Sequence, residues 1–146
     1  MKILDKKRDF ILTVEVRNAN PNGDPLNGNM PRTDYNGYGE ISDVAVKRKI
    51  RNRWQDMGME IFVKSNDRIN DDCRSLEKRF ENKFGKNTKE IDEKIYLDSC
   101  KEWLDVRSFG QVITFQKKSI GIRGPISISL AKRISPGIGE TKQITR

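Results

Sequence analysis

One segment rich in turn-forming residues interrupts the N-terminal part of this chain and most constrains its fold. Residues 18–39 contain six Asn, four Gly, three Pro and two Asp among 22 residues. These residue types favour tight turns and positive φ angles, so neither a regular helix nor a regular strand is expected there. Compact domains seldom keep a loop of this length unless it has a function. The sequence therefore predicts a long loop over residues 18–41.

The segments on either side of this loop have regular patterns. Residues 10–17 are rich in β-branched and aromatic side chains, and from Leu12 they alternate apolar with polar, which predicts a strand. A helix is predicted after the loop, capped by Ser42 or Asp43, running to about Met57 and closed by Gly58. The expected order is therefore strand, loop and helix.

The predicted helix has two different faces. At the helical period its apolar face consists of Val46, Ile50, Trp54 and Met57. Its opposite face carries the cations Lys47, Arg48 and Arg51. Because Trp54 lies in the apolar stripe, a core position is favoured over a base-stacking role. The helix is therefore expected to pack through one face and to offer three cations on the other.

The rest of the chain predicts a mixed α+β domain. Short strands are expected over 60–64, 111–115 and 126–130, and two helices over 71–103 with a break near 85–87. This order resembles half of a ferredoxin-like, RRM-like sheet with a helical insertion at about 66–104. The aromatic stacking motif typical of an RRM is absent. Binding to a nucleic-acid backbone is therefore favoured over base readout.

Charge is the strongest indication of a partner. The net charge is +8, and residues 106–139 hold six basic residues and no acidic one. A second run, residues 47–53, holds five basic residues in seven. Such one-signed stretches are typical of proteins that bind a polyanion.

Several functional classes are disfavoured by composition. There is no histidine, and Cys73 and Cys100 lie 27 residues apart without metal-ligand spacing, so no metal, no cofactor and no enzyme activity are expected. No segment has the roughly 20 apolar residues of a membrane span, and the N-terminus is not a signal peptide. A cytoplasmic protein that does not bind a membrane is predicted.

Four blocks in order resemble the Cas7 family of CRISPR-associated backbone subunits. The blocks are residues 20–34 (NPNGDPLNGNMPRTD), 42–52 (SDVAVKRKIRN), 105–110 (DVRSFG) and 121–125 (GIRGP). Residues 143–146 (QITR) resemble a further family segment, and the similarity is strongest to the type I-C branch, with type I-B second. The blocks occur in order across nearly the whole chain, so the match is specific.

The resemblance implies one partial, apparently truncated RRM-like domain over residues 1–146 that coats CRISPR guide RNA (crRNA). In this family several copies stack along the guide RNA and form the spine of the Cascade interference complex. The implied partners are crRNA, further copies of the chain and other Cascade subunits, with target DNA bound indirectly through the guide. The implied RNA-binding residues are Asn20, Asn22, Arg32, Lys47, Arg48, Arg51 and Arg123. Plain turn chemistry for Asn20 and Asn22, and pairing of Arg107 or Arg123 with Asp105 or with carbonyl groups, remain open alternatives.

Chain length raises further alternatives. Full backbone subunits are about twice as long, so a fragment, one half of a split protein or a truncated gene product is expected. A half-length copy could also join a complex and stop its growth, as a phage-type inhibitor would. An endoribonuclease is disfavoured, although some relatives cut RNA with an acidic residue of the corresponding loop, where Asp24 and Asp34 lie. Both are ordinary turn residues in their local sequence.

Overall fold

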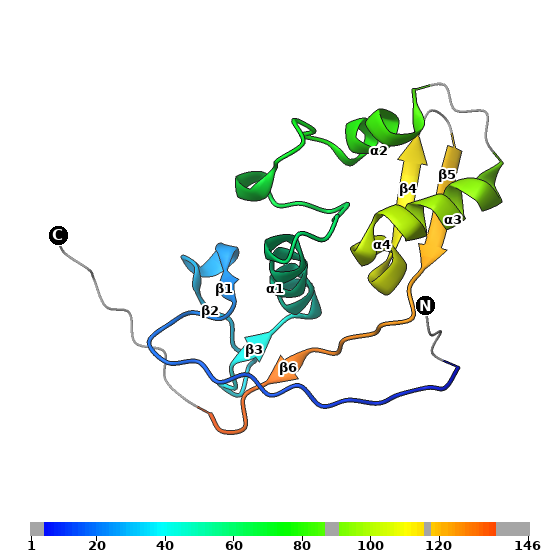
Figure 1. Cartoon of the computed structure of the whole chain (residues 1–146). Coiled ribbons are helices and arrows are strands. Elements are labelled where there is room, and N and C mark those ends of the chain that lie inside the picture. The colour runs from blue at the N-terminus through cyan, green and yellow to red at the C-terminus, as the bar shows by residue number, and fades with distance from the viewer. Residues whose placement is uncertain (1–4, 87–90, 116–117, 137–146) are drawn as a thin grey trace. The chain divides into compact units, whose positions relative to one another are not determined.

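The computed structural model describes residues 5–86, 91–115 and 118–136, which form two compact units (Figure 1). The loop unit combines residues up to Glu40 with those from Lys132 onward, and the helical unit spans Ile41–Ala131. The helices are α1 (Asp43–Asp56), α2 (Leu76–Phe84), α3 (Asp92–Glu102), α4 (Leu104–Phe109) and the 3-10 turns η1 (Pro25–Asn27) and η2 (Asn66–Arg68). The strands are β1 (Gly23–Asp24), β2 (Met30–Pro31), β3 (Glu40–Ile41), β4 (Gly110–Phe115), β5 (Lys118–Arg123) and β6 (Ala131–Lys132). The predicted α+β class is therefore confirmed.

The strands of the described residues pair in twos, β1 with β2, β3 with β6 and β4 with β5. The longest pair is the antiparallel hairpin β4–β5, whose register runs from Gly110 opposite Arg123 to Phe115 opposite Lys118. An RRM sheet has four strands. No sheet of that size occurs among residues 5–86, 91–115 and 118–136.

The hydrophobic core of the helical unit forms where α2, α3 and α4 pack against the β4–β5 hairpin (Figure 1). Alternation along the hairpin turns one set of side chains inward. Ring packing joins the elements: the ring centroids of Phe80 and Phe115 are 4.6 Å apart, and those of Phe62 and Trp103 are 4.4 Å apart. The cluster consists of Phe62, Phe80, Ile95, Trp103, Val106, Ile113, Phe115, Ile120 and Ile122. Burial of each such side chain contributes about 1.5–3 kcal/mol.

Helix α1 forms where the sequence predicts it. The Ser42 hydroxyl caps the helix by accepting a hydrogen bond from the Ala45 amide at 3.2 Å, and Gly58 follows the helix with φ of 77°. The predicted apolar face is only partly buried: Val46 is 6% exposed, whereas Met57 is 56% exposed. Trp54 is half-buried and stacks on Phe109, which favours the predicted packing role.

The two helices predicted between residues 71 and 103 are also confirmed. Ser75 caps α2, and Gly85 ends it with φ of 85°. Helix α3 follows, and α4 continues the chain to the hairpin. Residue 87 of the predicted break, and residues 143–146 of the family resemblance, lie outside the described residues. No helix in the described ranges is long and apolar enough to cross a membrane.

Three strand predictions are wrong, each for lack of a hydrogen-bonding partner strand. Residues 10–17 are not assigned to any strand, and their apolar side chains are exposed, Ile11 to 94%. Residues 60–64 form no strand because the amides of Phe62 and Val63 donate to a carboxylate instead of to a neighbouring strand. Residues 126–130 alternate apolar with polar but form no strand: β5 ends at Arg123, and β6 begins at Ala131.

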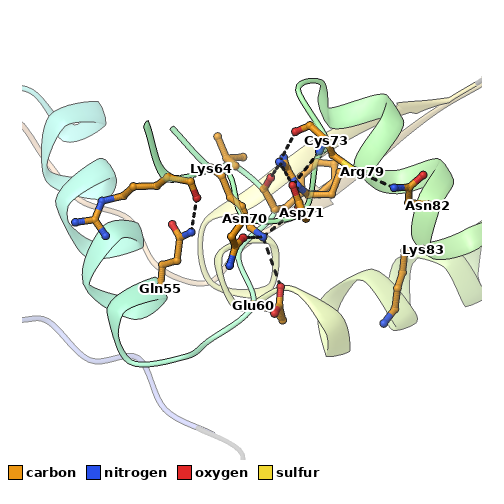
Figure 2. Close-up of polar contacts among 12 residues, drawn as sticks. Gln55, Glu60, Lys64, Asn70, Asp71, Cys73, Arg79, Asn82 and Lys83 are labelled. Carbon is orange, nitrogen blue, oxygen red and sulfur yellow. Dashed lines mark hydrogen bonds and ion pairs between the residues drawn. The ribbon is translucent and has the colours of Figure 1, made fainter. Parts of the chain in front are cut away.

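A buried polar network fixes the segment between α1 and α2 (Figure 2). The Arg79 guanidinium binds both carboxylate oxygens of Asp71, at 2.5 and 3.0 Å, and the carbonyl oxygens of Phe62 and Cys73, each at 2.7 Å. The Lys64 ammonium, 3% exposed, binds Asp71 Oδ2 at 3.0 Å and Asn70 Oδ1 at 2.7 Å. These polar groups are compensated, and they hold an irregular segment without a sheet.

Candidate nucleic-acid interface

The five basic side chains of α1 fall into two groups. Three of them have partners within the helical unit: Lys47, Arg48 and Arg51. The other two, Lys49 and Arg53, are exposed and have no side-chain partner among the described residues. They lie at positions i and i+4, so they share one face of the helix.

Arg51 is an internal anchor of α1. Its Nε donates to Asp105 Oδ2 at 2.9 Å, and the two side chains are 12% and 0% exposed. The same carboxylate accepts the amides of Phe62 at 2.8 Å and Val63 at 3.0 Å. The expectation that Arg51 points away from the core is therefore wrong. A buried carboxylate needs such compensation, and the helix supplies it.

Arg48 and Lys47 are also engaged within the unit. The Arg48 guanidinium donates to the Val63 carbonyl oxygen at 2.7 Å, and partial burial, with the charge of Arg51 next, lowers its pKa. The Lys47 ammonium lies 3.0 Å from Asp43 Oδ2. This hydrogen bond is the main reason that the pKa of Asp43 is lowered. The face of α1 predicted to be free thus forms packing contacts.

Phe109 is the point where three of the sequence blocks meet. The Arg51 guanidinium lies 5.2 Å and the Lys47 ammonium 5.9 Å from the centre of its ring, and the Trp54 ring stacks on it at 5.3 Å. Cations over an aromatic face are attracted by its quadrupole. The block 42–52 is therefore joined to the block 105–110.

The third block joins the other two through close backbone packing. A side chain at Gly124 would overlap the backbone of Ser108 and Phe109, and the Ile126 amide donates to the Ser108 carbonyl oxygen at 3.0 Å. Gly110 has φ of 78°, and a Cβ there would lie 2.5 Å from the Ile122 carbonyl oxygen. Only glycine tolerates this arrangement. Both glycines thus have a packing role in this junction.

The remaining predicted cation of the helical unit is Arg123. It ends β5 opposite Gly110, is exposed, and has no side-chain partner in the described ranges. The alternative that Arg107 pairs with Asp105 is not observed, because Arg51 holds that carboxylate. Arg123 thus joins Lys49 and Arg53 as a solvent-facing cation.

In the loop unit, the two predicted asparagines form turns. Asn20 Nδ2 donates to the Asn29 carbonyl oxygen at 2.8 Å, and Asn20 Oδ1 accepts the Asn22 backbone amide at 3.2 Å. The Asn22 carbonyl oxygen accepts the Arg32 amide at 2.9 Å, and Asp24 Oδ1 accepts the Leu26 amide at 3.1 Å. These contacts order the loop and favour the turn-forming alternative for both asparagines.

Asp34 organises the second half of the loop. Its Oδ1 accepts the amides of Asn36 at 2.9 Å and Tyr38 at 3.0 Å, and its Oδ2 accepts the Lys132 ammonium at 3.1 Å. The hydrogen bond from Tyr38 first, then the one from Lys132, lower the pKa of Asp34. Lys132 also lies 3.7 Å from Glu40 Oε1, and Arg32 Nε lies 4.0 Å from Glu40 Oε2. Arg32 is half exposed, so its guanidinium is accessible to a ligand.

Sequence reasoning missed Lys49, Arg53 and Lys132. For the two α1 cations a signal existed, because they flank the apolar stripe and can remain exposed when the opposite face also packs. For Lys132 no local signal existed, since its partner Asp34 is 98 residues away. Among the described residues, no three Cys, Asp or Glu side chains are grouped so that they could hold a metal ion.

Comparison with known proteins gives a family match and a partial match to a curated relative. The family model for CRISPR-associated protein Cas7 matches residues 6–146. A curated CRISPR-associated protein Cas7 from Haloferax volcanii is 39% identical over 59 residues. That match covers 40% of this chain and 17% of the relative's length.

Proposed function

Because this chain belongs to the Cas7 family, we propose that it is a crRNA-binding backbone subunit of a type I CRISPR Cascade complex. It coats guide RNA in the cytoplasm through the phosphate backbone, without reading the base sequence. Its partners are crRNA, further copies of the chain and other Cascade subunits, and target DNA is engaged through the guide. Type I-C is the preferred subtype, with I-B second. The family match over residues 6–146 carries this proposal.

We further propose that the chain supplies part of an RRM-like core and has no catalytic activity. Members of the family are typically non-catalytic backbone subunits. The two carboxylates considered for RNA cleavage have other roles: Asp24 caps η1, and Asp34 binds two amides and Lys132. A metal-dependent nuclease needs carboxylates free to hold the ion. Both observations favour binding over cleavage.

We infer from the geometry that the predicted RNA-binding residues have different roles. Arg32, Lys49, Arg53 and Arg123 are the proposed phosphate contacts, because their charged groups are exposed. Arg48 and Arg51 support α1 from within, together with Lys47. Asn20 and Asn22 shape the loop that carries Arg32. Cations that are already paired gain less from a phosphate, since an existing partner must be displaced.

Reconstitution tests the assignment as a backbone subunit. The chain is co-expressed with a type I-C complex that lacks its own backbone subunit, and separately with the intact complex. A guide-RNA filament that contains the chain in the first case is the expected result. Stunted and inactive complexes in the second case, without a filament in the first, would instead indicate an inhibitor. Failure to associate in either case would contradict the proposal.

Salt-dependent RNA binding tests the division of roles on α1. The double variant Lys49→Gln/Arg53→Gln should lower the slope of log K against log salt by about 1.4, at about 0.7 for each phosphate contact on a single strand. Arg74→Gln/Lys78→Gln is the control: it removes two other exposed cations four residues apart, one just before α2 and one within it, that have no side-chain partner in the described ranges. Equal losses of slope in the two variants would contradict a specific role for α1.

A further inference from the structure

The loop unit contains a chain of four alternating charges, of which only Arg32 has been assigned above to RNA binding. It runs from Asp34 through Lys132 and Glu40 to Arg32, with nitrogen–oxygen distances of 3.1, 3.7 and 4.0 Å along the way. The two carboxylates are largely covered, with exposed side-chain fractions of 17% and 14%. The two cations are half exposed. Glu40 is therefore shared between Lys132 and Arg32.

Backbone hydrogen bonds on both sides hold the segments that carry these charges. The Arg32 amide donates to the Asn22 carbonyl oxygen at 2.9 Å, and the Arg32 carbonyl oxygen accepts the Glu40 amide at 2.8 Å. On the other side, the Arg133 amide donates to the Gly39 carbonyl oxygen at 2.8 Å. Lys132 is thereby held beside the loop next to both carboxylates.

We propose that Lys132 is a positioning residue that keeps the Arg32 guanidinium available for an RNA phosphate by neutralising Asp34 and Glu40. This inference rests on the proposed RNA-binding function. With Lys132 present the four side chains sum to zero charge. Without it they sum to −1, and Glu40 is left with Arg32 as its cation. Arg32 then pairs with Glu40, and an incoming phosphate meets an uncompensated carboxylate.

A double-mutant cycle tests this coupling with the full chain and a mixed-sequence single-stranded RNA oligonucleotide. Lys132→Met should weaken binding about threefold at moderate salt, the scale of one phosphate contact. In an Arg32→Gln background the same substitution should have almost no effect, because the side chain through which it acts is gone. Glu40→Gln should restore the affinity of the Lys132→Met variant, since Arg32 loses its competing partner. Lys132→Arg should retain affinity.

The outcomes separate three situations. An equal loss from Lys132→Met in both backgrounds would overturn the inference, because Lys132 would then contact RNA itself. Unchanged binding of Lys132→Met would also overturn it. If the unsubstituted chain bound no RNA, the proposed function would fail as well, and that result is visible before any variant is made. Lys101→Met is the matched control, because it removes another exposed lysine that is paired with an aspartate, Asp98, at 3.3 Å. This substitution should leave the RNA affinity unchanged.

Discussion

Two aspartates, one in each unit, accept hydrogen bonds from the same kinds of partner but differ in burial. Asp105 of the helical unit accepts two backbone amides and the Arg51 guanidinium. Asp34 of the loop unit accepts two backbone amides and the Lys132 ammonium. The Asp105 side chain is 0% exposed and that of Asp34 is 17% exposed.

This difference in burial decides how much of the structure depends on the hydrogen bonds of each aspartate. Where water is excluded, an amide or guanidinium that loses its carboxylate has no replacement partner, so the whole unit depends on the contact. Near solvent, water replaces the lost partner, and only the local segment depends on the contact. The first site therefore supports the fold of the helical unit, and the second supports the shape of one loop.

Substitution of Asp105 should give the largest effect of this comparison. Asp105→Ala leaves the amides of Phe62 and Val63 and the Arg51 guanidinium without their acceptor, so the free energy of unfolding should fall by about 3–5 kcal/mol. Urea unfolding followed by circular dichroism measures it. Asp34→Ala is the matched control. A loss for Asp105→Ala no larger than that of the control would show that burial does not separate the two sites.

Removal of the cation from the buried site should cost less. In Arg51→Met the carboxylate keeps the amides of Phe62 and Val63, so a loss of about 2 kcal/mol is expected in the same unfolding measurement. Lys49→Met removes an exposed cation of the same helix and should change stability by no more than about 0.5 kcal/mol. Equal effects of the two substitutions would contradict the internal role of Arg51.

These contacts mark the limit of what could be predicted from the sequence. Helix α1 with its Ser42 cap, the helices after residue 71 and the strand at 111–115 were predicted because each depends on local patterns. The membership of the Cas7 family, predicted from four blocks, is confirmed by the family match. Local propensity and ordered motifs are thus sufficient for these features.

The orientation of α1 could not be predicted from its own sequence. The partner that draws Arg51 inward, Asp105, lies 54 residues later in the chain, and helical periodicity contains no such information. The same carboxylate replaces a strand partner for residues 62 and 63, so a β-like pattern there forms no strand. Charge alone indicated a polyanion partner, but it did not distinguish cations that support the fold from cations that face solvent.

Acidification should lower the stability of the helical unit through Asp71. The Arg79 guanidinium, together with Lys64, holds the pKa of Asp71 well below its usual range. A lowered folded-state pKa adds stability above the unfolded value near 4, and that stability is lost as the pH falls below about 4. Unfolding of the helical unit should thus become easier by about 2 kcal/mol between pH 6 and strongly acidic pH.

Variants at position 71 identify the source of this pH dependence. In thermal unfolding, Asp71→Asn should already have a lowered melting temperature at pH 6. Its melting temperature should then fall less on acidification than that of the unsubstituted chain. Asp34→Asn, whose aspartate also has a lowered pKa, should keep the acid sensitivity of the unsubstituted chain, because its contacts are local. An unchanged acid profile in Asp71→Asn would place the responsible carboxylate elsewhere.

The smallest effect is expected at Asp34, where loss of the carboxylate should open one turn without unfolding the chain. In Asp34→Ala the amides of Asn36 and Tyr38 lose their acceptor and exchange with water, so their hydrogen exchange should accelerate roughly tenfold. Lys132→Met removes only the cation and should leave both amides protected, because the carboxylate still accepts them. The urea midpoint of the helical unit should stay unchanged in both variants. A shift of that midpoint in Asp34→Ala would mean that the exposed site also supports the fold, and the contrast with Asp105 would fail.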